Sequence, residues 1–434
     1  MIRKFLVLTL MLICFNIAAQ RTSSSPYSFF GIGEQYSQST VEQSSMGQIG
    51  VASSSNYYLN FINPAANADL RVATYSFGLL HNYLTIKDNT GSQSASSTNL
   101  KYISLGFPLG EKAGFSAGFQ PISEVGYTFT NRGFDENTGD LNSITRFSGD
   151  GGVSRVFGGF GVKITDEINL GIEVDYSFGK TNNDILNQRA DVQLATKYSQ
   201  SSIIRGGSVK LGGQYHRQLK NNLQLDLGAT LKLNNDLSAT GTELLYSLTI
   251  ANNGGERPRD TTFNREASGE FNSPFSTNIG AGIGKINKWY AGLEYQFADA
   301  LSATGYLNRS NAAYNYESSS RLSLGGFYIP KINSINSYFE RVTYRAGLRY
   351  ENTGLSVNGD PTSNNFTSIN DFGMSFGLGL PLGNGVSNLN IGLEYGIKGT
   401  TSNNLIQENY FNIRASLSLN AIRELAWFQK REID

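Results

Sequence analysis

The sequence predicts an all-β protein: a 14-stranded antiparallel transmembrane β-barrel of the outer membrane, with an N-terminal hatch (plug) in its lumen. Three observations lead to this fold. Segments of about ten residues alternate between apolar and polar or small side chains, which is the pattern of strands with two unlike faces. Short and long connections follow one another in strict succession, and the chain begins with a segment typical of exported proteins.

Residues 1–20 have the features of a cleaved signal peptide. Arg3 and Lys4 form a basic start, residues 5–17 are apolar, and Ala18 and Ala19 are small residues of the kind that precede a cleavage site. The single cysteine, Cys14, lies within this segment. The exported chain is therefore expected to contain neither a disulfide nor a cysteine metal site.

The composition favours a large β-structure. Charged residues make up 16% of the chain, whereas Gly (48), Phe (26) and Tyr (23) are abundant, and disordered chains are poor in aromatic residues. Without Arg3 and Lys4, 33 basic residues stand against 35 acidic ones, so no basic surface indicates nucleic acid. After residue 20, no apolar run approaches the roughly 18 residues of a membrane helix. A membrane-spanning form of this chain is therefore expected to be a barrel.

Three segments show the alternation most clearly: "LGIEVDYSF" (170–178), "LQLDLGATLKL" (223–233) and "YAGLEYQF" (290–297). In the first, Leu170, Ile172 and Val174 share one face, and Glu173 and Asp175 share the other. A soluble β-sandwich would also alternate, but its outward face would be polar. The narrow, glycine-rich polar face seen here suits the lumen of a barrel with an apolar exterior.

The lengths of the connections predict the topology. Short turns are expected at 109–114, 165–167, 219–222, 286–288, 331–338 and 383–388, and long loops at 87–98, 130–142, 182–202, 235–274, 309–318, 353–369 and 400–408. Whether 240–271 forms a hairpin above the membrane stays open. Short periplasmic turns and long extracellular loops are typical of outer-membrane barrels. We predict a signal peptide (1–20), a hatch (21–70), the barrel (71–421) and a periplasmic C-terminal tail (422–434).

The inward face of the predicted barrel carries charges of both signs. Alternation places Glu173, Asp175, Lys210, Asp226, Glu294, Arg345, Arg349 and Glu394 there. These lumen charges suit either a ring that selects ions or a paired lining that holds a filled barrel together, and their interleaved signs favour the lining. Two strands also present inward glycines, namely Gly280, Gly282, Gly284, Gly373, Gly377 and Gly379. Such columns let another backbone approach the wall, and the hatch residues are the candidate.

The third predicted strand, "AGFSAGFQPISEVGYTF" (113–129), is interrupted at Pro121. Proline cannot donate a hydrogen bond to the ladder, so a kink or bulge is expected there. Since an unpaired backbone group facing lipid is costly, the interruption requires an internal partner or a gap in the wall. The residues at this kink are Gln120, Pro121 and Ile122, and a tolerated bulge near the rim is the alternative.

Four stretches of the chain resemble the FadL family of outer-membrane long-chain fatty-acid transporters, in the branch common among Bacteroidota. They are "MGQIGVA" (46–52), "NFINPAANADL" (60–70), "GFQPISEVGY" (118–127) and "GDGGVSRVFGGFGVKITDEINLGIEVDYSFG" (149–179). The resemblance implies a hatch whose signature is Asn63, Pro64 and Ala65, and a lateral portal at the kink of Gln120 to Ile122. Tyr57, Tyr58 and Phe61 are then expected to anchor the hatch inside the lumen.

Two functions follow from these expectations. In the first, which is the main expectation, the protein takes up an outer-membrane lipid or another hydrophobic small molecule passively, through the hatch and the lateral portal. In the second, it is a non-transporting accessory or scaffold barrel of an outer-membrane protein machine for secretion or β-barrel assembly, and its partners are proteins. A surface adhesin or phage-receptor-like barrel that acts through its loops is a weaker third option.

The chain is not expected to be an enzyme or to hold a cofactor or metal. Its two histidines are His81 and His216, and neither stands beside a recognisable nucleophile motif. The sequence also contains no zinc or calcium ligand spacing and no phosphate-binding loop.

Overall fold

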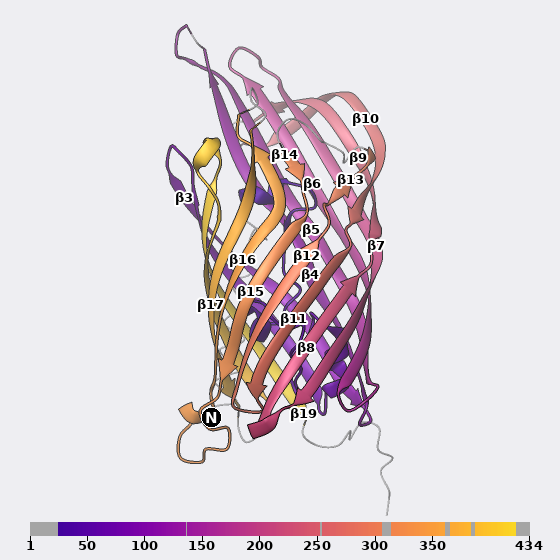
Figure 1. Ribbon diagram of the computed structural model, residues 1–434. Helices are drawn as coiled ribbons and strands as arrows, with labels where there is room; N and C mark the ends of the chain where they lie inside the picture. Colours follow the sequence, from indigo (N-terminus) through magenta and orange to yellow (C-terminus); the bar gives the residue numbers. More distant parts are fainter. Residues whose placement is uncertain are drawn as a thin grey trace, which may run out of the picture.

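The computed structural model describes residues 25–135, 137–251, 254–305, 314–360, 365–382 and 387–421, and shows a tall barrel (Figure 1). The predicted signal peptide (1–20) and C-terminal tail (422–434) lie outside the described residues. Among the residues that are described, no helix is long and apolar enough to cross a membrane.

Fourteen antiparallel strands form the closed wall, and its first and last strands, β2 and β19, pair with each other. The strands are β2 (Ala73–Lys87), β3 (Ser92–Leu109), β4 (Ala113–Phe134), β5 (Leu141–Lys163), β6 (Ile168–Arg189), β7 (Ala195–Gln218), β8 (Leu223–Lys232), β11 (Ser276–Lys285), β12 (Trp289–Ala298), β15 (Ser319–Tyr328), β16 (Thr343–Asn358), β17 (Phe366–Pro381), β18 (Asn388–Gly399) and β19 (Gln407–Ala421). The predicted fold class is confirmed.

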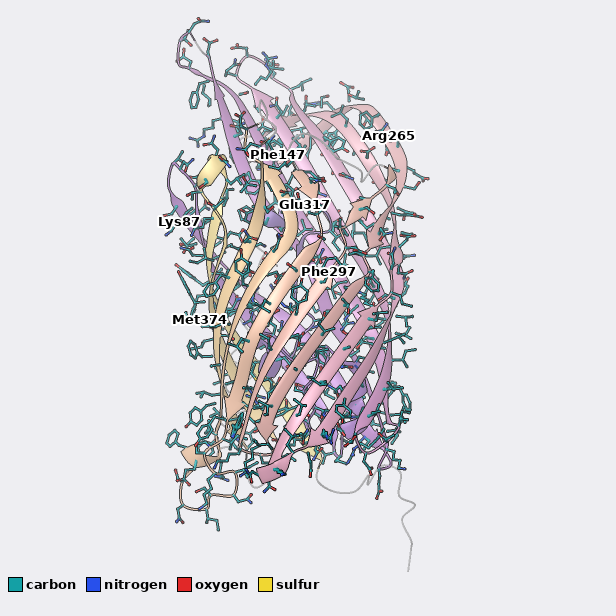
Figure 2. The ribbon with its side chains drawn as sticks, viewed as in Figure 1. Lys87, Phe147, Arg265, Phe297, Glu317 and Met374 are labelled. Atoms are coloured by element: carbon teal, nitrogen blue, oxygen red, sulfur yellow. The ribbon has the colours of Figure 1, made fainter. Side chains whose placement is uncertain are left out.

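The burial of each strand follows the predicted alternation. On β6, Leu170 and Val174 are 48% and 56% exposed, whereas Glu173 and Asp175 are 2% and 3% exposed. On the opposite side of the barrel, Met374 of β17 projects outward from the wall (Figure 2). The apolar face of the strands therefore forms the outer surface, and the polar face is enclosed.

A hairpin above the wall replaces the long loop that was expected at 235–274. Strands β9 (Asn235–Ile250) and β10 (Glu256–Ser273) pair along their length, and β9 pairs with the upper part of β7. Below them, β8 pairs directly with β11. The hairpin is thus an insertion that raises one side of the barrel, seen at the upper right of Figure 1.

Several predicted loops are shorter than expected because the strands continue into polar sequence. The connections between strands are 88–91, 135–140, 190–194 and 359–365, in place of 87–98, 130–142, 182–202 and 353–369. Antiparallel ribbons with both faces in water need no apolar side chains, so hydropathy does not reveal them. The turn expected at 331–338 is instead a longer connection, 329–342, which contains η5 (Phe339–Arg341). Two short strands, β13 (Ser302–Ala303) and β14 (Tyr314–Tyr316), lie above β12 and β15.

We call residues 25–72, which precede the first wall strand, the N-terminal segment. It contains η1 (Pro26–Phe29), β1 (Glu34–Gln35), α2 (Val41–Ser44) and η2 (Pro64–Asp69). The single turn of α2 is stabilised by a capping box, in which the side chains of Thr40 and Gln43 each accept a hydrogen bond from the other residue's backbone N–H. The segment, coloured indigo in Figure 1, lies inside the wall.

Candidate functional site

Glycines of the wall make room for the backbone of the N-terminal segment. A Cβ atom added at Gly171 would lie 2.3 Å from the backbone nitrogen of Ala65, and one at Gly228 would lie 2.1 Å from the carbonyl oxygen of Val51. Of the glycines expected to admit a backbone, Gly280 and Gly377 meet side chains of the segment, Gly284 meets wall backbone, and Gly282, Gly373 and Gly379 meet wall side chains. The close approach of a backbone therefore occurs, but at glycines other than the six predicted ones.

The stretch that contains Asn63, Pro64 and Ala65 forms the start of η2, which lies against β6 and β7. Asn63 is fully buried and its side-chain oxygen accepts a hydrogen bond from the backbone N–H of Ala65, which caps η2. Its side-chain nitrogen donates to the carbonyl oxygens of Val51 and Gly213, at 2.7 Å and 3.0 Å. One asparagine thus joins two parts of the segment to the wall.

The aromatic residues before Asn63 differ in how they are held. Phe61 is fully buried and packs edge-on against Tyr102 and Phe157. Tyr58 lies beside Tyr57, and the guanidinium of Arg345 lies 5.4 Å from the centre of the Tyr58 ring. All three predicted aromatic anchors therefore contact groups inside the barrel.

At its far end, η2 is joined to the wall by Asp69. Its carboxylate lies 3.1 Å from Lys163 Nζ, and it accepts a hydrogen bond of 2.8 Å from the side chain of Asn169. Burial acts to raise the pKa of Asp69, but hydrogen bonds from Ser54 and Lys163 and nearby positive charge outweigh it and hold the pKa below its ordinary value of 3.8. Asp69 therefore favours its charged form.

His216, one of the two histidines, lies close to Asp69. Its Nδ1 is 2.6 Å from Asp226 Oδ1, and its Nε2 is 3.5 Å from Asp69 Oδ2. The predicted lumen charge Asp226 is thus partnered by this histidine. His81, by contrast, contacts Thr98 at an exposed position.

The predicted lumen charges are buried in separate, paired groups. In the first group, Arg155 Nη1 lies 2.7 Å from Glu173 Oε1 and 3.6 Å from Asp175 Oδ2. Lys210 Nζ lies 2.8 Å from the same Glu173 oxygen and donates to the carbonyl oxygen of Phe61. This group therefore fastens the N-terminal segment as well as three strands.

In the second group, Arg349 and Arg414 share the carboxylate of Glu394. Arg349 Nε lies 3.0 Å from Glu394 Oε1, and Arg414 donates to the other oxygen. Arg349 also lies 2.9 Å from Asp371 and 3.1 Å from Glu351. The five side chains come from β16, β17, β18 and β19, so the group ties together the side of the barrel where the chain closes.

The remaining two predicted charges hold the N-terminal segment or its neighbours. Glu294 Oε2 accepts hydrogen bonds of 2.8 Å from the backbone N–H groups of Gly50 and Val51. Arg345 Nη1 donates to Asn390. All eight predicted lumen charges thus have partners, which is the paired lining that interleaved signs favoured.

The sequence reasoning missed Arg155, Arg414 and Asp371, which complete these groups. Alternation could have found Arg155, because it is in phase with Val153 and Phe157, both buried. The glycines at 151–152 and 158–159 obscured that pattern in the sequence. A single strand also gives no sign of which charge on another strand will face it.

The wall is interrupted at the predicted kink. Strand β4 pairs with β3 from Ala113 to Phe119, and its register with β5 shifts between Pro121 and Ser123. Among the described residues, the part of β3 before Ile103 pairs with β2 alone. Gln120 at this kink is 1% exposed and accepts hydrogen bonds from Arg155.

Strand β1 of the N-terminal segment occupies this interruption. Glu34 and Gln35 pair with Glu124 and Ser123, and the backbone N–H of Tyr36 donates to the carbonyl oxygen of Ile122. The hydroxyl of Tyr36 donates to Glu124, 2.7 Å away. The proline-broken strand thus has the internal partner that its sequence called for.

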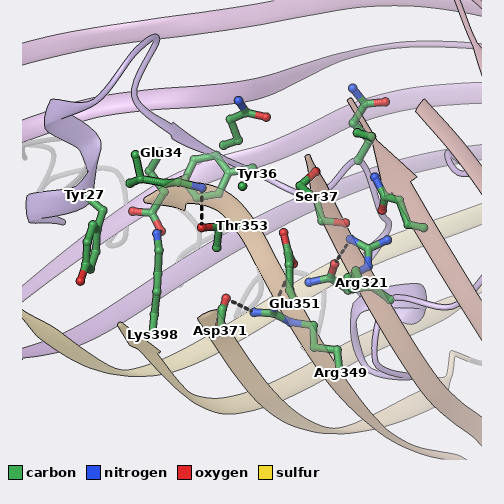
Figure 3. Close-up of a pocket in the computed structure, with 18 of the residues that line it drawn as sticks. Tyr27, Glu34, Tyr36, Ser37, Arg321, Arg349, Glu351, Thr353, Asp371 and Lys398 are labelled. Carbon is green, nitrogen blue, oxygen red and sulfur yellow. Dashed lines mark hydrogen bonds and ion pairs between the residues drawn. The ribbon is translucent and has the colours of Figure 1, made fainter. Parts of the chain in front are cut away.

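A cavity of about 390 Å³ remains in the upper lumen (Figure 3). Charged and hydrogen-bonding side chains dominate its lining, and Figure 3 shows Arg349 beside Asp371 and Glu351, with Lys398 and Glu34 on another side. Lys398 Nζ lies 3.2 Å from Glu34, which belongs to the N-terminal segment. The enclosed space is therefore mainly polar, although apolar side chains such as Ile32, Leu80 and Leu84 also line it. Among the described residues, no cluster of three or more His, Cys, Asp or Glu could hold a metal ion.

Solved structures with a similar fold include transporters and channels. A FadL homologue from Pseudomonas aeruginosa aligns with a TM-score of 0.58 and 13% identity, over 88% of this chain and 98% of its own. The toluene transporter TodX of P. putida gives 0.56 and 17%, over 89% and 100%. A channel described as the CymD monoaromatic hydrocarbon channel gives 0.55 and 15%, over 88% and 97%. At these identities the likeness shows a shared FadL-like fold, that of an outer-membrane barrel.

Two comparisons rest on the sequence. No characterised relative matches it. A family model described as BamG matches residues 1–434.

Proposed function

The chain belongs to the BamG family, and we propose that it acts as a non-transporting accessory barrel, a scaffold within an outer-membrane protein machine. The observation that carries this proposal is the attachment of the N-terminal segment to the wall. Hydrogen bonds or ion pairs link the segment to β3, β4, β6, β7, β12, β15, β17, β18 and β19.

Moving the segment out of the lumen would carry a high energetic cost. The carboxylate of Glu294, 2% exposed, would lose the two backbone N–H groups that it binds. Removing the partner of a buried charge costs about 3–5 kcal/mol, and Lys210 and Asp69 would each lose a contact as well. These contacts support a segment that stabilises the barrel in place.

The polar cavity also supports a scaffold over a hydrophobic channel. A hydrophobic molecule gains free energy by leaving water for an apolar surface, but the larger share of this lining is polar and includes the charged Arg349, Lys398 and Glu408. Water bound to such charges would also have to be displaced, at further cost. The outer surface of the barrel and its raised hairpin β9–β10 remain available to protein partners.

Gentle solubilisation of the native membrane tests the proposal. The protein should be recovered at constant stoichiometry in a complex several times its own mass, as measured by native electrophoresis and mass spectrometry. Recovery as a free monomer at all detergent concentrations would refute a scaffold role.

Uptake of hydrophobic small molecules is the second candidate, favoured by the interruption between β3 and β4. On the edge of β4 that faces β3, the described residues that pair with it beyond Phe119 are those of β1 and the adjoining Tyr36, so the departure of β1 would open the wall sideways. The test compares entry of a fluorescent hydrophobic probe into cells with and without the protein. Faster entry in producing cells that disappears when β1 is crosslinked to β4 supports uptake, and equal entry excludes it.

A further inference from the structure

Lys101 enters the lumen through a bulge in β3. The register between β2 and β3 shifts by one residue, so that Gly78 pairs with Tyr102 and Leu79 with Leu100, and Lys101 is the extra residue. Both Lys101 and Tyr102 are therefore buried, at 8% and 0% exposure, although neighbours on a regular strand point to opposite faces. Alternation counted back from Tyr102 and Ser104, both buried, would have directed this lysine toward lipid.

The ammonium group of Lys101 has no hydrogen bond or ion pair among the described residues, and it lines the cavity. The charges that act on it most strongly are Arg414, Glu394 and Arg349, two cations and one anion. Glu394 is already engaged by both arginines. A buried ammonium without an anion in direct contact is costly, so Lys101 is left able to bind one.

A second unsatisfied donor belongs to Arg414, which also lines the cavity. The Nε atom of Arg414 is buried and has no hydrogen-bond partner. Asn82, Ser97 and Asn412 line the same cavity and add amide and hydroxyl groups. These residues come from β2, β3 and β19, so they lie on both sides of the junction between the first and last wall strands.

We propose that Lys101 and Arg414 bind a small hydrophilic oxyanion, with carboxylate or phosphate oxygens, inside the barrel. Ammonium and guanidinium N–H groups pair well with such oxygens. The larger share of the cavity lining is polar, which favours a free, water-soluble anion over the head of a lipid. The bound anion joins β3 to β19 across the place where the barrel closes. This inference does not depend on the scaffold role.

Isothermal titration of the purified full-length protein tests the site, with inorganic phosphate and acetate as separate probes in a non-ionic detergent at constant ionic strength. At least one probe should bind saturably, and Lys101→Met should weaken that binding at least tenfold. Lys101→Arg, which keeps the charge, should bind within a few-fold of the wild type. Lys87→Met is the matched control, because Lys87 is an exposed lysine at the end of the adjacent strand (Figure 2), and should bind normally.

The outcomes are separable from misfolding. Each variant is first checked for the shifted mobility of a folded barrel in unheated electrophoresis, and Lys101→Gln replaces Lys101→Met if the latter fails this check. Absence of saturable binding for both probes, an equal response to chloride, or unchanged binding in the neutral variants would overturn the proposal. Native mass spectrometry that finds a retained lipid in the wild type and its loss in Lys101→Gln would also overturn it, in favour of a lipid head.

Discussion

Arg155 and Glu173 form an ion pair of 2.7 Å in the lumen, and their side chains are only 1% and 2% exposed. The pair lies between β5 and β6 and shares Glu173 with Lys210, which in turn binds the backbone of the N-terminal segment. Arg155 also lies over the ring of Phe157, 4.6 Å from its centre. A buried charge group therefore fastens both the wall and the segment that fills it.

Removing Arg155 should strongly destabilise the folded barrel. Arg155→Met leaves Glu173 and Asp175 with less compensation, and breaking a buried pair costs about 3–5 kcal/mol. The matched control is Arg132→Met at an exposed position of β4, where about 0.5 kcal/mol or less is expected. Denaturant unfolding of the reconstituted barrel measures both. Equal losses of unfolding free energy for the two substitutions would show that the ion pair does not stabilise the folded barrel.

Replacing the side-chain NH2 group of Asn63 by oxygen should weaken the attachment of the N-terminal segment. Asn63→Asp keeps the oxygen that caps η2 but loses the N–H groups that bind the carbonyl oxygens of Val51 and Gly213. Asn63→Ala should lower the free energy of unfolding by about 2–4 kcal/mol, through loss of the cap and the unsatisfied carbonyl groups. Asn63→Asp should lower it further, because a carboxylate oxygen then faces two carbonyl oxygens. Limited proteolysis of the N-terminal segment measures its attachment. Greater protection in the Asp variant than in the Ala variant would contradict the assigned hydrogen bonds.

Gly171 should tolerate no side chain, whereas Gly213 on the neighbouring strand should accept one. A Cβ atom at Gly171 would meet the backbone of Pro64 and Ala65 within 2.4 Å, whereas at Gly213 the nearest atom is 3.7 Å away. Gly171→Ala is therefore expected to cost about 1–3 kcal/mol or more through overpacking, and Gly213→Ala less than about 0.5 kcal/mol. The measurement is the free energy of unfolding of each variant. Similar values for the two would show that the backbone of Pro64 and Ala65 does not lie against Gly171.

Acid should weaken the junction at Asp69. Because its pKa is held below 3.8 in the folded state, the carboxylate stabilises the protein fully above that value, and the contribution is lost as the pH falls through the folded pKa. The difference in unfolding free energy between the wild type and Asp69→Asn should therefore shrink as the pH is lowered from 7 toward 3. A difference that stays constant or grows on acidification would contradict the depressed pKa.

The sequence predicted the barrel well where apolar and polar residues alternate, as in Leu170 to Phe178. Hydropathy failed where strands continue above the membrane into polar sequence, and it left open the hairpin of Asn235 to Ser273, which has little apolar contrast. Lys101 could not be assigned to the lumen because its position depends on a one-residue bulge, and such a shift reverses the face that each later residue occupies.

The candidate site was predicted in part of its members and not in its pairing. Glu173 and Arg349 were placed inward correctly, yet which charge meets which depends on how neighbouring strands align. The predicted kink at Pro121 is present as a register shift, and its internal partner, Tyr36, belongs to a stretch without strand alternation. The lateral portal itself stays a prediction, as does the branch of the family.

A reversible crosslink between the N-terminal segment and the wall tests the scaffold account most directly. Ser45 Oγ lies 2.5 Å from the place of a Cβ at Gly392, so Ser45→Cys with Gly392→Cys suits a disulfide. The chain contains one native cysteine, within its first 20 residues, and the single variant Ser45→Cys is the control. The measurement is the recovery of the native complex, together with hydrophobic-probe entry, from cells that contain only the oxidised, crosslinked protein. The account predicts the same complex and the same probe entry as in the wild type; loss of either on oxidation, with recovery on reduction, would show that the segment has to move.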